Sequence, residues 1–375
     1  CHKVGGHGTE TFVQAIENSC NPVFIDIGQR IGVEDFYHYF QQFGLMTKTG
    51  IDIPGEAGTI MHKMENIGAV ELATISFGQS FQITPIQLAT TVSSIINGGT
   101  RVTPHFGVEI RNGEGELLKR FRYETTEGIV SEETSETMRF LLEKVVSEGG
   151  GNKAYIEGYR IGGKTGTADK TGTKDVVVSF MCFAPADDPQ YIMLLTMDTP
   201  SRTTGTAVFG GTMVAPVASQ IMSEILPLLG VEPDYTAEEL VGADTTVPNV
   251  VGQTREAAED RLADLGFTFR TVGDGDTVTD QTPAGGAIVP GNASIILYLG
   301  QEKPDTPCTV PNVVGKSASE ANKAITNAGL IMKVTGTTTA SSGNVYAITQ
   351  SLPAGTEVAA GTVVTVQFGD NSVLD

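Results

Sequence analysis

Two short motifs combine residue types that could act together on an acyl group. The first is Ser19-Cys20-Asn21, which places a hydroxyl and an amide two residues apart. In a turn these side chains can converge on one pocket, where the serine would relay a proton and the asparagine would hold a substrate amide. The alternative is structural, because a serine beside a helical segment commonly caps that helix.

The second motif is Lys164-Thr165-Gly166, which precedes a polar turn at residues 169–174 and an apolar strand at residues 176–183. This order predicts a hairpin with the motif near the end of its first strand. An edge strand exposes backbone groups that can pair with an extended peptide, and Gly166 would leave that peptide room to approach. A charged hairpin end that binds nothing is the alternative.

The side chains of this motif suit a peptide that ends in a carboxylate. Lys164 supplies a positive charge, and the hydroxyl of Thr165 can donate a hydrogen bond to the carboxylate. The backbone N–H of Thr167 would stand beside them as a donor to a developing oxyanion. The candidate catalytic residues are therefore Ser19, Asn21 and Lys164, and the candidate substrate-binding residues are Lys164, Thr165, Gly166 and Thr167.

Neither motif is unique, so the surrounding sequence must decide between the copies. Lys-Thr-Gly also begins at Lys48, which precedes a loop, and at Lys170, inside the polar turn, where it is ordinary turn composition. A second Ser-x-Asn begins at Ser342, in a segment with the composition of a loop. Only Lys164 lies at the end of a predicted strand, which would fix its position.

Helical and strand patterns surround these motifs. Helices are expected at residues 11–17, 34–43, 85–96, 132–147 and 215–229, and strands at residues 155–164, 175–183 and 191–198. Because the strands follow one another without alternating helices, we expect an α+β domain with an antiparallel sheet.

The last third of the sequence repeats itself. Val247-Pro248-Asn249-Val250-Val251-Gly252 recurs 63 residues later, from Val310 to Gly315. Each copy continues into a helical pattern and then strands, which predicts two small strand–helix–strands modules, the second with extra residues near 337–343. The expected organisation is a main domain at 1–230, a linker at 231–245, a first module at 246–300, a linker at 301–307 and a second module at 308–370.

The helix of each module has its own signals. Gly266 and Gly329 stand where a helix end favours a positive φ, and Ser317 and Glu320 have the spacing of a capping box. Three apolar residues fall on one helix face in each module: Ala258, Leu262 and Leu265 in the first, and Ala321, Ile325 and Ala328 in the second.

The composition excludes some classes of protein. A formal net charge of −20 argues against binding to nucleic acid, which depends on clustered Lys and Arg. No stretch approaches the roughly 20 apolar residues of a membrane-spanning helix. Because the sequence begins with Cys1 and lacks a signal peptide, we expect a piece of a longer protein with any membrane anchor upstream.

The four cysteines are too few for a disulfide scaffold. Cys1 and Cys20 are a candidate redox pair, since a bridge would close a loop of about 20 residues next to the first motif. Two free thiols are the alternative. Cys182 lies in an apolar strand pattern and is expected to be packed there. Because Cys1, His2 and His7 lie at a chain end without fixed geometry, no metal site is predicted, and no cofactor.

The sequence around both motifs resembles class B penicillin-binding proteins. Ser-x-Asn and Lys-Thr-Gly match the second and third signatures of penicillin-interacting serine transpeptidases. The resemblance covers roughly residues 1–230, and the two modules resemble PASTA domains. The segments that carry it are residues 19–24, 43–56, 76–79, 84–89, 162–168, 183–186 and 210–216.

This resemblance implies a peptidoglycan D,D-transpeptidase on the extracytoplasmic face of the bacterial cell membrane. Such an enzyme transfers the D-Ala-D-Ala end of a stem peptide to a serine and then to a neighbouring amine, and β-lactams acylate the same serine. Ser19 and Asn21 would be the proton relay and the amide binder, and residues 164–166 the carboxylate site. The implied partners are stem peptides, β-lactams and other wall-synthesis proteins.

One feature of the family is missing. Its nucleophile belongs to a Ser-x-x-Lys motif several dozen residues before Ser-x-Asn, and no serine here is followed three positions later by lysine. We therefore expect that the nucleophile lies upstream, together with the first strands of the sheet. This chain alone should then be inactive, and a sheet edge or an apolar face should be left uncovered.

Two other functions fit the same residues. The PASTA-like modules could make this a non-catalytic protein that binds peptidoglycan or muropeptides, or they could serve only as spacers. A relative that has become a β-lactamase or a carboxypeptidase is disfavoured by the appended modules. Roles in division, elongation and sporulation are not distinguished by the sequence.

Overall fold

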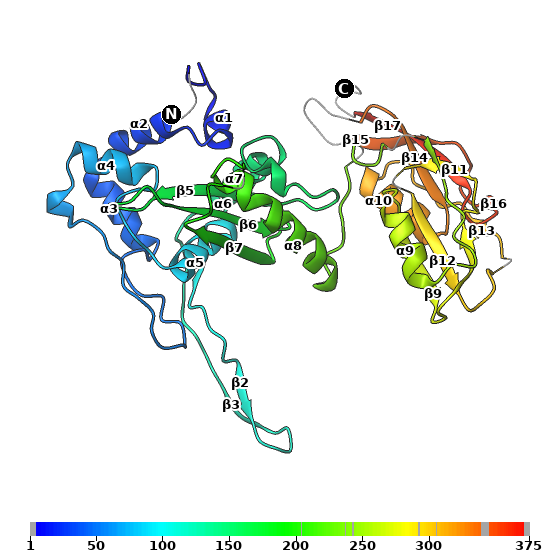
Figure 1. Ribbon diagram of the computed structural model, residues 1–375, viewed down its shortest axis with the longest axis horizontal. Coiled ribbons are helices and arrows are strands. Elements are labelled where there is room, and N and C mark those ends of the chain that lie inside the picture. The colour runs from blue at the N-terminus through cyan, green and yellow to red at the C-terminus, as the bar shows by residue number, and fades with distance from the viewer. Residues whose placement is uncertain are drawn as a thin grey trace. The chain divides into compact units, whose positions relative to one another are not determined.

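The computed structural model describes residues 5–203, 205–236, 238–241, 244–291, 293–304, 306–338 and 345–370. The chain divides into two compact units, Cys1–Glu232 and Pro233–Asp375 (Figure 1). Within the described ranges, no helix combines the length and the apolarity that crossing a bilayer requires.

The first unit is built around a three-stranded antiparallel sheet (Figure 1). Strand β6 (Val176–Ala184) lies between β5 (Gly162–Asp169) and β7 (Tyr191–Asp198). The side chains of β6 alternate between two buried faces, as expected of a central strand. Cys182, which is fully buried as predicted, faces the core formed with helix α8 (Ala215–Leu228), while Phe183 faces Ile96 of helix α5 (Pro85–Ile96).

Helices surround this sheet, and a hairpin formed by β2 and β3 projects from the unit (Figure 1). The helices are α1 Phe12–Glu17, α2 Asn21–Ile31, α3 Val33–Gln42, η1 Met64–Asn66, α4 Ala69–Ser76, α5 Pro85–Ile96, α6 Glu132–Ser147, η2 Asn152–Ala154, α7 Gly210–Met213 and α8 Ala215–Leu228. Two further strand pairs are β1 Arg101–Val102 with β4 Thr125–Thr126, and β2 Glu109–Arg111 with β3 Leu117–Arg120.

The predicted α+β architecture is confirmed, and three elements (α5, α6 and β7) have the bounds expected from the sequence. The prediction of a strand at residues 155–164 is wrong for residues 155–161, which do not form a strand. Residues 156 and 159 form only an isolated bridge around a tight turn, in which Gly158 has a φ of 72°. Because β5 runs from Gly162 to Asp169, the Lys-Thr-Gly motif lies in the middle of the strand and not near its end.

The second unit contains two modules of the same topology, each with a helix, a three-stranded sheet and a short strand pair. The sheets are ordered β10-β12-β9 and β14-β17-β15, with β9 parallel to β12 and β14 parallel to β17. The first module consists of β8 Asp244–Thr246, α9 Arg255–Ala263, β9 Thr268–Gly273, β10 Val278–Thr282, β11 Ile288–Pro290 and β12 Ser294–Leu299. The second consists of β13 Cys308–Thr309, α10 Ala318–Asn327, β14 Ile331–Gly336, β15 Val345–Gln350, β16 Glu357–Val358 and β17 Val363–Asp370.

The helix signals of the modules are confirmed with one exception. Gly266 and Gly329 have φ values of 80° and 75°, and the Ser317–Glu320 capping box forms. Leu265, expected on the buried face, is 48% exposed because α9 ends at Ala263 and the chain turns away before it. The extra residues of the second module fall between β14 and β15, where residues 339–343 lie outside the described ranges.

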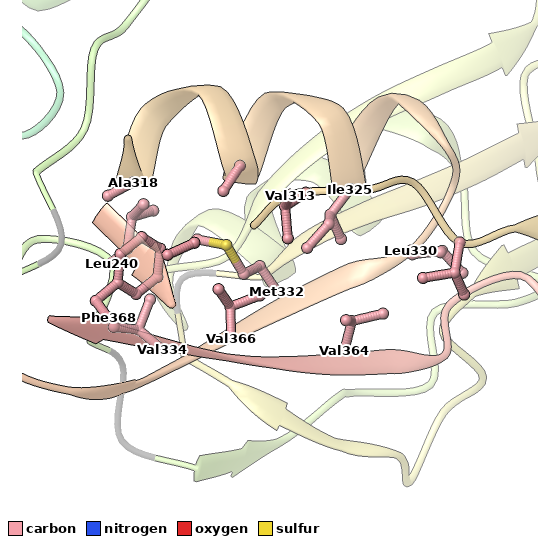
Figure 2. Packing of buried hydrophobic residues seen from close by; sticks show 13 residues of the cluster. Leu240, Val313, Ala318, Ile325, Leu330, Met332, Val334, Val364, Val366 and Phe368 are labelled. Carbon is pink, nitrogen blue, oxygen red and sulfur yellow. The ribbon is translucent and has the colours of Figure 1, made fainter. Parts of the chain in front are cut away.

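Each module also receives core residues from outside its repeat. Figure 2 shows that Leu240, from the segment expected to be a linker, packs into the core of the second module. Ile331 on β14 of the second module is 5% exposed and belongs to the core of the first module. The two modules are therefore packed against each other.

In each module one glutamine side chain makes the same three hydrogen bonds to the backbone; Gln281 is buried and Gln350 is partly buried. The amide of Gln281 accepts a hydrogen bond from the N–H of Val250 (2.7 Å) and donates to the carbonyl oxygens of Pro248 (2.9 Å) and Pro283 (3.1 Å). Gln350 makes the corresponding three bonds in the second module, with Val313, Pro311 and Leu352. Because buried backbone groups need partners, each glutamine is required by its module.

We expect Gln281→Leu to lower the free energy of unfolding by about 2 kcal/mol, because it leaves the buried N–H of Val250, the buried carbonyl of Pro283 and the partly buried carbonyl of Pro248 without their partner. Chemical denaturation of the full chain would measure the change. Gln367→Leu, on the exposed side of β17, is the matched control and should stay close to the unsubstituted protein. Equal losses in both variants would contradict this role of Gln281.

Candidate active site

Ser19 occupies the turn between α1 and α2. Its φ is 49°, a left-handed conformation that is uncommon for residues with a Cβ atom. The N–H of Ser19 bonds to the carbonyl of Ile16 (3.0 Å), and the N–H of Cys20 bonds to that of Ala15 (2.8 Å), which holds the turn in place. Cys20, and not Ser19, is the residue before α2, so the hydroxyl of Ser19 is not a cap for that helix.

Helix α6 connects this turn to the sheet. Ile16 of α1 packs with Leu141 and Val145 of α6, and α6 in turn packs along β5. The chain after α6 comes so close to α1 that a Cβ atom on Gly149 would lie 2.8 Å from the carbonyl oxygen of Glu17. The position of Ser19 relative to β5 is therefore set by packed helices.

The side chains of Lys164 and Ser19 are in contact with each other. The Lys164 Nζ donates a hydrogen bond to Ser19 Oγ (2.8 Å) and another to the carbonyl oxygen of Thr165 (3.0 Å). Burial of the ammonium group lowers the pKa of Lys164 from 10.5 to about 8. An amine with this pKa is mostly protonated at pH 7 but exchanges its proton more readily than an exposed lysine does.

Strand β5 has a free edge beside this lysine, because β6 pairs with its other side. The carbonyl oxygen of Thr167 accepts a hydrogen bond from the side chain of Gln79 (3.5 Å), so it points away from β6. In a strand, the N–H and C=O of one residue point to the same side, and the direction alternates along the chain. The N–H groups of Thr165 and Thr167 consequently face the free edge.

Gly166 is closely packed by neighbours within the chain. A Cβ atom there would lie 2.4 Å from Ser179 Oγ on β6. The start of α7 packs on the same place, since a Cβ atom on Gly210 would lie 2.7 Å from the carbonyl oxygen of Gly166. The sequence interpretation explained this glycine by the approach of a ligand, whereas the structure supplies an intramolecular reason.

A cleft of about 870 Å³ continues along β5 beyond Thr167. Gln79 and Phe81 line one part of it, and Ala168 and Lys170 line another. Gln79 therefore joins the cleft to the edge of β5 through its bond to Thr167. Sequence reasoning gave Gln79 no role, and only its place in the segment 76–79 that resembles the family drew attention to it.

The structure brings together some of the predicted residues. Ser19 and Lys164 are in contact, Thr165 and Thr167 lie on the free edge, and Asn21 is the partly buried first residue of α2. Cys20 is 6% exposed and carries a free thiol, while Cys1 lies outside the described residues, so the redox pair stays a prediction.

The other two copies of Lys-Thr-Gly lie in different surroundings. In the first, the backbone and hydroxyl of Thr49 bond to the carboxylate of Glu56 and close a loop. In the third, Lys170 bonds to Asp198 at the hairpin turn (2.6 Å). Among the three lysines, Lys164 is the one that the structure places against Ser19.

Comparisons with known proteins agree with this geometry. Residues 2–223 match the family model of the penicillin binding protein transpeptidase domain, and residues 245–301 and 309–370 match that of the PASTA domain. The chain is 41% identical over 313 residues to stage V sporulation protein D of Bacillus subtilis, covering 80% of this chain and 48% of that protein. It is 31% identical over 222 residues to PbpB of Mycolicibacterium smegmatis, covering 56% of this chain and 34% of that protein.

Solved structures show the same fold. Penicillin binding protein 3 of Mycobacterium tuberculosis, complexed with ampicillin, matches with a TM-score of 0.54 and 26% identity, over 60% of this chain and 52% of that one. The transpeptidase domain of penicillin-binding protein 3 of Burkholderia pseudomallei matches with a TM-score of 0.52 and 30% identity, over 61% of this chain and 67% of that one. The chain thus spans about half the length or less of the two curated relatives. It belongs to the penicillin-binding protein transpeptidase family, with two PASTA domains following its transpeptidase domain.

Proposed function

We propose that this chain supplies the substrate edge and the proton relay of a serine D,D-transpeptidase that cross-links peptidoglycan stem peptides. The hydrogen bond between Lys164 and Ser19 carries the proposal, because it joins both signature motifs in one site. We further propose that the acylated serine comes from outside these residues, since no serine of the sequence stands in a Ser-x-x-Lys motif.

Each group of the site has a role in this reaction. The D-Ala-D-Ala end pairs with the free edge of β5, where the hydroxyl of Thr165 and the charge of Lys164 hold its carboxylate. The N–H of Thr167 donates to the oxyanion that forms at the attacked carbonyl. Ser19 passes a proton between Lys164 and the reacting group, and Asn21 holds an amide of the substrate.

The relatives support the ligand class and the place of action. The similar protein of M. tuberculosis is solved with ampicillin, which supports β-lactams as inhibitors of this site. An enzyme that acts on peptidoglycan would work on the extracytoplasmic face of the bacterial membrane, where other wall-synthesis proteins would be its partners. The match to a stage V sporulation protein favours a role in sporulation over a role in elongation.

The buried ammonium group of Lys164 should affect stability in a defined pH window. Between pH 8 and 10.5 the unfolded lysine holds a proton that the folded one has lost. The free energy of unfolding should therefore rise with pH, relative to Lys164→Met, by about 1.4 kcal/mol per unit in that window. Denaturation of both proteins from pH 7 to 11 measures this difference, and parallel curves would contradict the lowered pKa.

The chain of 375 residues should not be acylated by a fluorescent penicillin, because none of its serines has an activating Ser-x-x-Lys lysine. Gel fluorescence and mass spectrometry would detect an adduct. An active penicillin-binding protein labelled in parallel shows that the reagent works. An adduct mapped to Ser19 or to another serine of this chain would disprove the proposal of an external nucleophile.

A peptide ending in D-Ala-D-Ala should bind at the edge of β5 without reacting. Lys164→Met should weaken this binding at least tenfold, because it removes the charge that holds the terminal carboxylate. Lys48→Met is the matched control, as it changes the same tripeptide in a loop outside the cleft. Chemical-shift titration of both variants gives the affinities, and equal losses would contradict a specific role of Lys164.

A further inference from the structure

Three side chains with metal-binding atoms meet behind the Ser19 turn. They are His7, Glu10 and Cys20, and their ligand atoms all lie within 4.8 Å of one another. His7 and Glu10 precede α1, and Cys20 follows it. The short helix turns the chain back on itself and so brings together residues that are 13 positions apart in the sequence.

These side chains are largely withdrawn from solvent. The side chains of His7 and Glu10 are 9% and 7% exposed, and Cys20 is 6% exposed. Removing a carboxylate from water is costly unless its charge is compensated. The groups placed around the Glu10 carboxylate include the Cys20 thiol and the His7 ring, and both are common ligands of transition metals.

We propose that His7, Glu10 and Cys20 bind one zinc ion, with a fourth position left for water or another ligand. A set of imidazole, carboxylate and thiolate suits zinc, whereas magnesium and calcium prefer oxygen ligands. Two ligands of a tetrahedral zinc ion lie about 3.4 Å apart. His7 Nδ1 lies 3.7 Å from Glu10 Oε1, so small side-chain movements complete the geometry.

An outer residue already orients one ligand. The Asn18 side chain donates a hydrogen bond to Glu10 Oε1 at 2.6 Å, as expected of a group that fixes a coordinating carboxylate. Asn18 is also the C-cap residue of α1 and directly precedes Ser19. Zinc on Cys20 would therefore fasten the segment at residues 7–10 to the turn that presents Ser19 to Lys164.

Metal binding can be tested without any assumption about enzymatic activity. The full chain, stripped of metal, is titrated with zinc by calorimetry, and the expected result is one ion per chain. Cys20→Ser, His7→Gln and Glu10→Gln should each weaken binding more than tenfold. Cys308→Ser and His38→Gln are matched controls at residues away from the site and should bind as the unsubstituted chain does.

Cobalt supplies a readout that needs no variant. Cobalt bound to a thiolate gives an intense charge-transfer absorption, which should appear in the unsubstituted chain at one equivalent and disappear in Cys20→Ser. Asn18→Ala, which leaves all three ligands in place, should weaken binding about tenfold. Absence of both zinc uptake and the cobalt band in the folded, unsubstituted chain would overturn the proposal, as would full-strength binding by folded Cys20→Ser.

Discussion

The bond from Lys164 Nζ to Ser19 Oγ joins residues 145 positions apart, and the rest of the first unit serves to make it. A buried ammonium group loses its hydration, and the acceptors that replace water are the Ser19 hydroxyl and the carbonyl of Thr165. The hydroxyl reaches this position only because Ser19 adopts a left-handed turn, at a cost of about 1 kcal/mol or more. Packing of α1 on α6, and of α6 on β5, maintains that strained geometry.

Much of this fold is readable in the sequence where local signals agree. Helix α5 begins at Pro85 behind a capping box of Thr84 and Gln87, and its apolar periodicity runs to its end, so its bounds could be predicted. Helix α2 could not, because Gly28 in its middle counts against a helix. The structure shows why glycine is there: a Cβ atom at Gly28 would lie 1.8 Å from Ser76 Oγ at the end of α4. Close packing between helices overrides local preference at this position.

For the site as well, the sequence indicated residue types, whereas their positions in space depend on packing. The motifs drew attention to Ser19 and Lys164, whose side chains are in contact, but this contact depends on two packed helices that no motif describes. Gln79 carried no chemical signal, because its role arises only from the distance of its amide to Thr167. For the metal ligands, the sequence interpretation considered Cys1, His2 and His7 at the chain end. It overlooked Glu10 and Cys20, whose proximity to His7 is created by the turn of α1.

The contact of Ile331 with the first module's core has a mechanical meaning for the second unit. Separating the modules would expose the Ile331 side chain. A Cβ atom on Gly361 of the second module would lie 2.9 Å from the Thr282 side chain of the first, so the two modules are closely packed where they meet. A flexible linker sets only the largest distance between the two domains that it connects, whereas a rigid pair of domains also sets the smallest distance. Because the two modules pack against each other, the pair keeps its two ends at a nearly fixed separation, which two modules on a flexible linker would not do.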